Sequence, residues 1–169
     1  MENIISFQPK LSRLIPKVVN NKDYFEYRTL IERIDEILNA TGFDLDFAWN
    51  YLNSLEVEEG KEFTRKQIEK YTKYSVTALR CMIIKNISQK GFRELSVSIG
   101  ESSLLQWFCH IENNGNTVKV PSKSAIQRFA TIISVEELTT LMNSLYDKTS
   151  CKDNPLQLAD PFNAEGFVE

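Results

Sequence analysis

The chain has 169 residues, of which 42% are hydrophobic and 25% charged, with a net charge of −3. This composition is typical of an ordinary globular domain, and three widely spaced cysteines favour reduced, mostly structural thiols over a disulfide framework. No apolar run is long enough to span a bilayer and the first residues lack a signal-peptide core, so we expect a cytoplasmic protein without membrane contact.

The charge is distributed unevenly along the chain. Residues 61–93 carry nine Lys or Arg against two Asp or Glu, a net charge of +7, whereas residues 1–60 and residues 94–169 each carry −5. A basic segment inside an acidic chain has two interpretations. It is either the solvated face of a helix or a surface that attracts phosphates, because clustered cations release counterions from DNA whatever the total charge of the protein.

The N-terminal part of the chain predicts an extended arm followed by helices. The arm covers residues 1–22, which contain two prolines and scattered cations, and a helical domain is expected over residues 23–148. In the first predicted helix apolar side chains recur at helical spacing, with Asp23 as the N-cap and Gly42 as the end. A second helix is expected to begin near Asp44.

The basic segment predicts two further helices. Thr64 and Gln67 have the spacing of a capping box, which marks a helix start. The stretch that follows is longer than an average helix, so a break is predicted at residues 74–77. The helix after the break is expected to pack in the core and to carry Arg80 and Lys85 on its polar face.

The remainder of the chain completes an all-α prediction of about six to eight helices. Two short helices are expected around Gly100, and an Asn-Asn-Gly-Asn turn is expected at residues 113–116. Ser134 and Glu137 form another capping box, which starts a helix to about residue 148. An irregular linker is expected over residues 149–169.

The stretch after Pro121 raises the question of DNA recognition. Ser122 suits the N-cap of a helix whose apolar positions face inward. Its first turns carry polar and basic side chains that point mainly outward, at positions Lys123, Ser124, Gln127 and Arg128. A recognition helix contacts bases and phosphates with such residues in its N-terminal turns. A well-capped surface helix that only packs is the alternative, and composition alone favours it.

No arrangement of residues in the sequence supports catalysis or metal binding. His110 and three scattered cysteines lack zinc-ligand spacing, and adjacent residues such as Cys109 and His110 do not face each other on a helix. The carboxylates do not form a spaced acid pair, and no glycine-rich phosphate loop is present. Trp107 and Phe108 fit the core, although base stacking is the other role for such residues.

The order of several short motifs resembles the N-terminal region of bacterial insertion-sequence transposases of the DDE class. The matching elements follow one another over residues 65–169, and they are Leu79-Arg80, Phe92-Arg93-Glu94-Leu95, Leu105 to Phe108, Pro121 to Ser124 and Ile126 to Phe129. The tail from Leu156 resembles the linker that leads to the first catalytic aspartate of those enzymes. The resemblance implies an all-α DNA-binding part at residues 64–148, with an element similar to a helix-turn-helix.

The resemblance also implies what this chain lacks. The catalytic core of those transposases is a ribonuclease-H-like sheet that holds three carboxylates, which bind two Mg²⁺ ions. The sequence supplies no such sheet. Asp160 lies in the linker and does not match a catalytic position. We therefore expect no cofactor and no catalysis in this chain, which would be the front end of a split, truncated or decayed transposase.

The expected partner is double-stranded DNA from the terminal repeats of the element, in association with the bacterial nucleoid. Phosphate contacts are expected from the basic segment, and base or phosphate contacts from the helix after Ser122. The candidate DNA-binding residues are Arg65, Lys66, Lys70, Lys73, Arg80, Lys85, Arg93, Lys123, Ser124, Gln127 and Arg128. The alternative function is protein–protein interaction, as a homodimer or as a docking or inhibitory fragment for a transposase catalytic domain.

Overall fold

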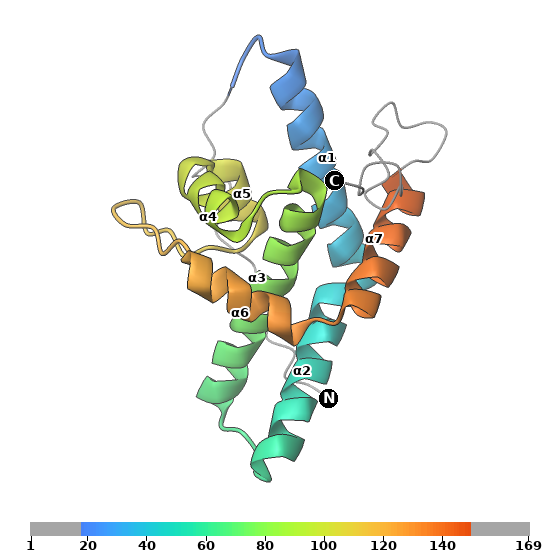
Figure 1. Cartoon of the computed structure of the whole chain (residues 1–169), viewed down its shortest axis with the longest axis vertical. Coiled ribbons are helices and arrows are strands. Elements are labelled where there is room, and N and C mark those ends of the chain that lie inside the picture. Colours follow the sequence, from blue (N-terminus) through green and yellow to red (C-terminus); the bar gives the residue numbers. More distant parts are fainter. Residues whose placement is uncertain (1–17, 150–169) are drawn as a thin grey trace.

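The computed structural model describes residues 18–149, which form seven α-helices and no strand within that range (Figure 1). The all-α prediction is therefore confirmed. The helices are α1 (Lys22–Thr41), α2 (Phe43–Glu59), α3 (Arg65–Ser88), α4 (Phe92–Glu101), α5 (Ser103–Phe108), α6 (Lys123–Ile132) and α7 (Val135–Thr149). None of the helices in the described part of the chain is long and apolar enough to cross a membrane.

The ends of the helices are fixed by side-chain and glycine caps. Thr64 and Gln67 form the predicted capping box at the start of α3, and Ser134 and Glu137 exchange the same pair of hydrogen bonds before α7. Gly42 ends α1 in the left-handed region, at φ +66°, and α2 begins at the next residue. The predicted cap Asp23 is wrong: Asn21 caps α1, and its side chain accepts from the Tyr24 backbone N–H.

Helix α3 is the central helix of the fold, and it is continuous across the predicted break at residues 74–77. That prediction was wrong because the segment contains neither glycine nor proline, and the Ser75 hydroxyl donates to the Thr72 carbonyl inside the helix. Its second half is buried, from Ser75 to Ile84, while its first half carries exposed lysines. At 1.5 Å per residue, the helix is about 36 Å long.

The other helices pack around the buried half of α3. Helix α2 runs along α3, α6 crosses it, and α1, α5 and α7 close the remaining sides (Figure 1). The first half of α3 and the second half of α2 form a helical hairpin that extends away from this body (Figure 1). One hydrophobic core therefore holds the fold, and part of the basic segment projects from it.

The predicted arm and linker lie almost entirely outside the described residues. Of the arm, residues 18–22 are described, and Lys22 already begins α1. Of the linker, only Thr149 is described, and it ends α7 with its hydroxyl donating to the Leu145 carbonyl.

Candidate nucleic-acid interface

Three lysines form an exposed row on the first half of α3. Lys66, Lys70 and Lys73 follow the i, i+4, i+7 spacing of one helix stripe, and all three are exposed. We call this set the lysine stripe. Along the helix axis it extends over about 10 Å, which corresponds to about three phosphates of one DNA strand.

The three lysines of the stripe differ in their surroundings. Within the described part of the chain, no ion pair involves Lys66 or Lys70. Lys73 lies near Glu112, whose pKa is lowered by the hydrogen bond from Lys119 and, to a lesser degree, by the charge of Lys73. The Glu112 carboxylate therefore offsets part of the positive charge of the stripe, at the Lys73 end.

Arg65 belongs to another side of α3. It precedes Lys66 by one residue, so it points about 100° away from that lysine. Its guanidinium lies 3.6 Å from the Glu69 carboxylate, in an exposed pair of the i, i+4 kind. Arg65 therefore does not extend the lysine stripe, although it remains exposed to solvent.

The start of α6 presents the side chains that the sequence predicted to point outward. The Ser122 hydroxyl accepts the Ala125 backbone N–H and so caps the helix. The inner face is held by two buried side chains, Ile126 and Phe129. The outer face is exposed at all four predicted positions, which are Lys123, Ser124, Gln127 and Arg128.

Helix α6 lies against α3 beside the lysine stripe. The rings of Tyr74 and Phe129 meet edge to face with centroids 5.3 Å apart. Tyr74 follows Lys70 by one turn, so the contact with α6 lies on the same side of α3 as the middle of the stripe. Two predicted sets of cations, about fifty residues apart in the sequence, are thereby brought onto neighbouring helices (Figure 1).

The first turn of α4 adds one exposed cation to the surface beside α6. The Ser96 hydroxyl donates to the Pro121 carbonyl at 2.8 Å, which places the middle of α4 against the residues that lead into α6. Arg93 lies one turn before Ser96 and is exposed. Lys85 is half-buried at the end of α3, with its ammonium 4.9 Å from the centre of the Phe92 ring. It is engaged there and lies well away from the lysine stripe.

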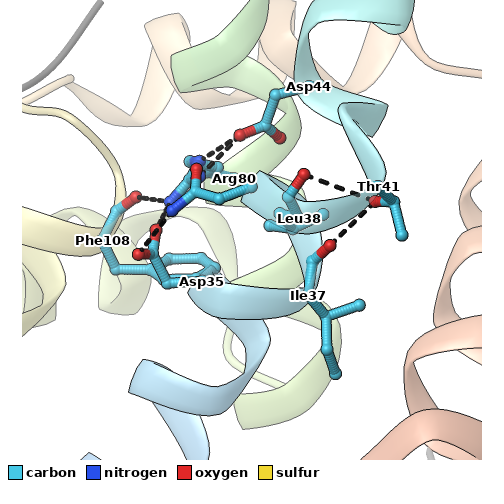
Figure 2. A network of polar contacts seen from close by, with 8 residues as sticks. Asp35, Ile37, Leu38, Thr41, Asp44, Arg80 and Phe108 are labelled. Atoms are coloured by element: carbon cyan, nitrogen blue, oxygen red, sulfur yellow. Dashed lines mark hydrogen bonds and ion pairs between the residues drawn. The ribbon is translucent and has the colours of Figure 1, made fainter.

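Arg80 is not a DNA contact, and that prediction is wrong. Its side chain has no exposed surface. Figure 2 shows the guanidinium between two carboxylates: Nε and Nη2 donate to Asp44 at 2.8 and 2.6 Å, and Nη1 donates to Asp35. Nη1 also donates to the Phe108 carbonyl at 3.0 Å. A phosphate cannot reach this group, because helices α1 and α2 and the end of α5 enclose it.

The Arg80 network instead joins three parts of the core. It connects α3 to α1 through Asp35, to α2 through Asp44, and to the end of α5 through Phe108. Burial raises the pKa of Asp44, and the charge of Arg80 acts in the opposite direction. A buried carboxylate of this kind requires its cation, so the network is structural.

Lys119 was not among the candidate residues predicted from the sequence, and it lies beside Glu112, near the Lys73 end of the lysine stripe. Residues 112–119 form a short hairpin that ends three residues before Ser122. The Lys119 ammonium is 80% exposed and lies 2.9 Å from the Glu112 carboxylate. The signal was present in the sequence, because an Asn-Asn-Gly-Asn turn leads into an extended Thr-Val-Lys-Val segment.

The cysteine and histidine side chains of the described residues lie in the core or close to it. Within residues 18–149, no group of three His, Cys, Asp or Glu side chains is placed to hold a metal ion. Cys81 and Cys109 are buried in the core, where a mutual hydrogen bond and burial raise the pKa of the Cys81 thiol well above its usual range. Burial and the nearby charge of Arg80 lower the pKa of His110 to about 3. The two thiols are buried, and His110 is half-buried.

Comparisons with protein-family models, with curated proteins and with solved structures give no match for this chain. Function is therefore inferred from the geometry of the chain itself.

Proposed function

We propose that this chain is a DNA-binding domain that lacks catalysis of its own. The observation that carries the proposal is the packing of α6 beside the lysine stripe, since it brings separate exposed cations of an acidic protein onto two helices that are in contact. The motif order supports a more specific assignment, the N-terminal, end-recognising domain of an insertion-sequence transposase with a helix-turn-helix-like part. The expected ligand is then the terminal repeat of the element as a duplex.

The two parts of the surface have different tasks in this proposal. The lysine stripe contacts phosphates along one strand, which fixes the position of the protein but carries no sequence information. The first turns of α6 enter the major groove, where Gln127 and Arg128 reach base edges. Lys123 and Ser124 contact the flanking phosphates, assisted by the free backbone N–H groups at the start of the helix.

The first test measures binding of labelled duplex DNA by fluorescence anisotropy at low salt. Replacing all three lysines of the lysine stripe by glutamine is expected to weaken binding by more than tenfold, because three phosphate contacts are lost. A control variant with glutamine at Lys22, Lys61 and Lys148 has the same net charge, and all three positions are exposed. The control is expected to bind within about twofold of the wild-type protein. Equal weakening by both variants would reject the surface proposed here.

The transposase assignment needs a separate test, because a general DNA-binding domain would pass the first one. Duplexes from the ends of the source element are compared with scrambled duplexes of the same composition. Selective binding that is lost in the Gln127→Ala and Arg128→Ala variants would support end recognition by α6. Equal binding to both kinds of duplex would leave phosphate contact alone and reject the reading role of α6.

Two exposed apolar side chains on α2 favour a second candidate function, protein–protein interaction. Trp49 is 65% exposed, and Leu45, one turn earlier, is 37% exposed. Exposed tryptophans are enriched at the centres of protein interfaces. A concentration-dependent mass in sedimentation that Trp49→Gln abolishes would support self-association. A constant monomer mass, together with no binding to a separate catalytic domain, would reject this candidate.

A further inference from the structure

The hairpin of residues 112–119 projects from the helical body beside the start of α6 (Figure 1). Its two arms are joined by the hydrogen bond from the Lys119 N–H to the Glu112 carbonyl, at 3.0 Å, and by the bridge between Asn113 and Val118. The residues at its tip, 114–117, are all exposed. The tip has no apolar side chain that would have to be buried against the body, so it can project into solvent and remain accessible to a ligand.

The tip is held in shape by its own asparagines. The Asn114 side-chain oxygen accepts from the backbone N–H groups of Asn116 and Thr117, at 3.0 and 2.8 Å. The Asn113 side-chain oxygen accepts from the Gly115 N–H at 2.8 Å, and Gly115 adopts a φ of +90°. A loop with these bonds loses little conformational entropy when it binds a partner.

The base of the hairpin is anchored to the core. The Asn113 side-chain amide donates to the Gln106 side-chain oxygen at 3.2 Å. Gln106 is buried, and its own amide donates to the carbonyls of Ile99 and Gly100 at the end of α4. This chain of hydrogen bonds fixes the direction in which the hairpin leaves the body.

The base of the hairpin adjoins both parts of the proposed DNA surface. At its base, Glu112 is paired with Lys119 and lies near Lys73, the last residue of the lysine stripe. Beyond Lys119 the chain runs without regular structure to Ser122, which caps α6. A duplex that contacts both the lysine stripe and α6 therefore passes next to the hairpin.

We infer that the hairpin is a second DNA-reading element, whose tip enters the minor groove next to the major groove occupied by α6; this inference rests on the proposed function. The reach is sufficient. Lys123 follows Gly115 by eight positions, which allows up to about 27 Å of extended chain. The centres of adjacent grooves are about 17 Å apart, half of a DNA turn.

The chemistry of the tip suits the minor groove. The Asn116 side-chain amide makes no hydrogen bond within the described part of the chain, and it offers both a donor and an acceptor. Minor-groove proteins use asparagine and lysine to distinguish A·T from G·C pairs, because only guanine places an amino group in that groove. Lys119, with 80% exposure, is placed to contact a phosphate at the edge of the groove.

The experiment changes the minor groove and leaves the major-groove acceptors of guanine in place. Binding is measured to a mixed-sequence duplex of 30 base pairs and to the same duplex with inosine in place of every guanine, since inosine lacks the minor-groove amino group. We expect the wild-type protein to bind the inosine duplex about tenfold more tightly. The Asn116→Ala and Asn114→Ala variants should lower that ratio to less than twofold. Asn143→Ala, at an exposed position of α7, is the matched control and should keep the wild-type ratio.

The outcomes separate this inference from the function on which it rests. Binding that depends on the lysine stripe but is equal for the two duplexes would overturn the inference and leave the proposed function standing. An inosine preference that both hairpin variants retain would also overturn it, because another element would then read the minor groove. No binding to either duplex at low salt would overturn the proposed function and the inference together.

Discussion

Arg80 and the lysine stripe show how closely a structural cation can resemble a binding one in a sequence. Arg80 follows Lys73 by seven residues, two helical turns, so it lies on the same stripe of α3 as Lys66 and Lys70. The difference comes entirely from the neighbouring helices, because Asp35 and Asp44 cover this stripe in its second half. An amphipathic pattern shows which residues share a face, but it does not show where along the helix that face is covered.

The buried network predicts a large loss of stability when Arg80 is removed. In Arg80→Ala the free energy of unfolding should fall by about 3–5 kcal/mol, because two carboxylates lose their common cation inside the protein. Urea unfolding followed by circular dichroism measures the change. Arg65→Ala is the control on the same helix and should change stability by less than about 0.5 kcal/mol, as its ion pair is exposed. Similar losses in the two variants would contradict the structural role of Arg80.

His110 predicts a loss of stability on acidification. Its pKa is about 3 in the folded protein against an ordinary 6.5, so protons bind preferentially to the unfolded chain. The contribution of neutral His110 to the free energy of unfolding is therefore complete above pH 6.5. It declines as the pH falls and is lower by about 2 kcal/mol at pH 5. The window from pH 7 to pH 5 is suitable, because the raised pKa of Asp44 acts in the opposite direction at lower pH.

The test compares the wild-type protein with His110→Asn in urea at several pH values. His110 has a φ of +55°, a conformation that asparagine tolerates well, so this variant removes the titration without adding backbone strain. Relative to His110→Asn, the wild-type protein should lose about 2 kcal/mol of unfolding free energy between pH 7 and pH 5. A difference that is constant over this range would show that His110 titrates normally in the folded state.

At the scale of the elements, the sequence predicted helix starts better than helix continuity. Capping boxes are local, so Thr64 with Gln67 and Ser134 with Glu137 could be identified from spacing alone, and both are present. The break predicted in α3 at residues 74–77 was based on the length of the segment. Burial of Val76 and its neighbours stabilises the helix there, and such tertiary packing commonly overrides local propensity.

The cap of α3 predicts a measurable contribution from a single hydroxyl. Thr64→Ala should lower the free energy of unfolding by about 1 kcal/mol, because the hydroxyl that accepts the Gln67 backbone N–H and donates to the Gln67 side-chain oxygen is lost. Thr131→Ala is the control, since that exposed hydroxyl donates only to a carbonyl of its own helix. Equal effects of the two substitutions in urea unfolding would show that the cap does not limit the stability of α3.

At the scale of the whole molecule, the candidate site depends on contacts that a sequence does not report. The outward direction of Lys123 and Arg128 followed from helical periodicity, and the structure agrees. The meeting of α6 with α3 through Tyr74 and Phe129 did not follow, because it joins residues 55 positions apart. The same holds for the placement of the hairpin at residues 112–119, which was expected only as a turn.

The proposed surface predicts a steep salt dependence for a protein whose net charge is −3. Six exposed cations lie on it: the lysine stripe, Arg93, Lys123 and Arg128. If each contacts one phosphate, the logarithm of the binding constant should fall with the logarithm of salt concentration with a slope of about −5, roughly a thousandfold loss between 50 and 200 mM. Glutamine at the three positions of the lysine stripe should reduce the slope by about 3, because each lost contact removes about one unit. A wild-type slope near −1 would mean that these cations act separately and that α3 and α6 do not form a common DNA-binding surface.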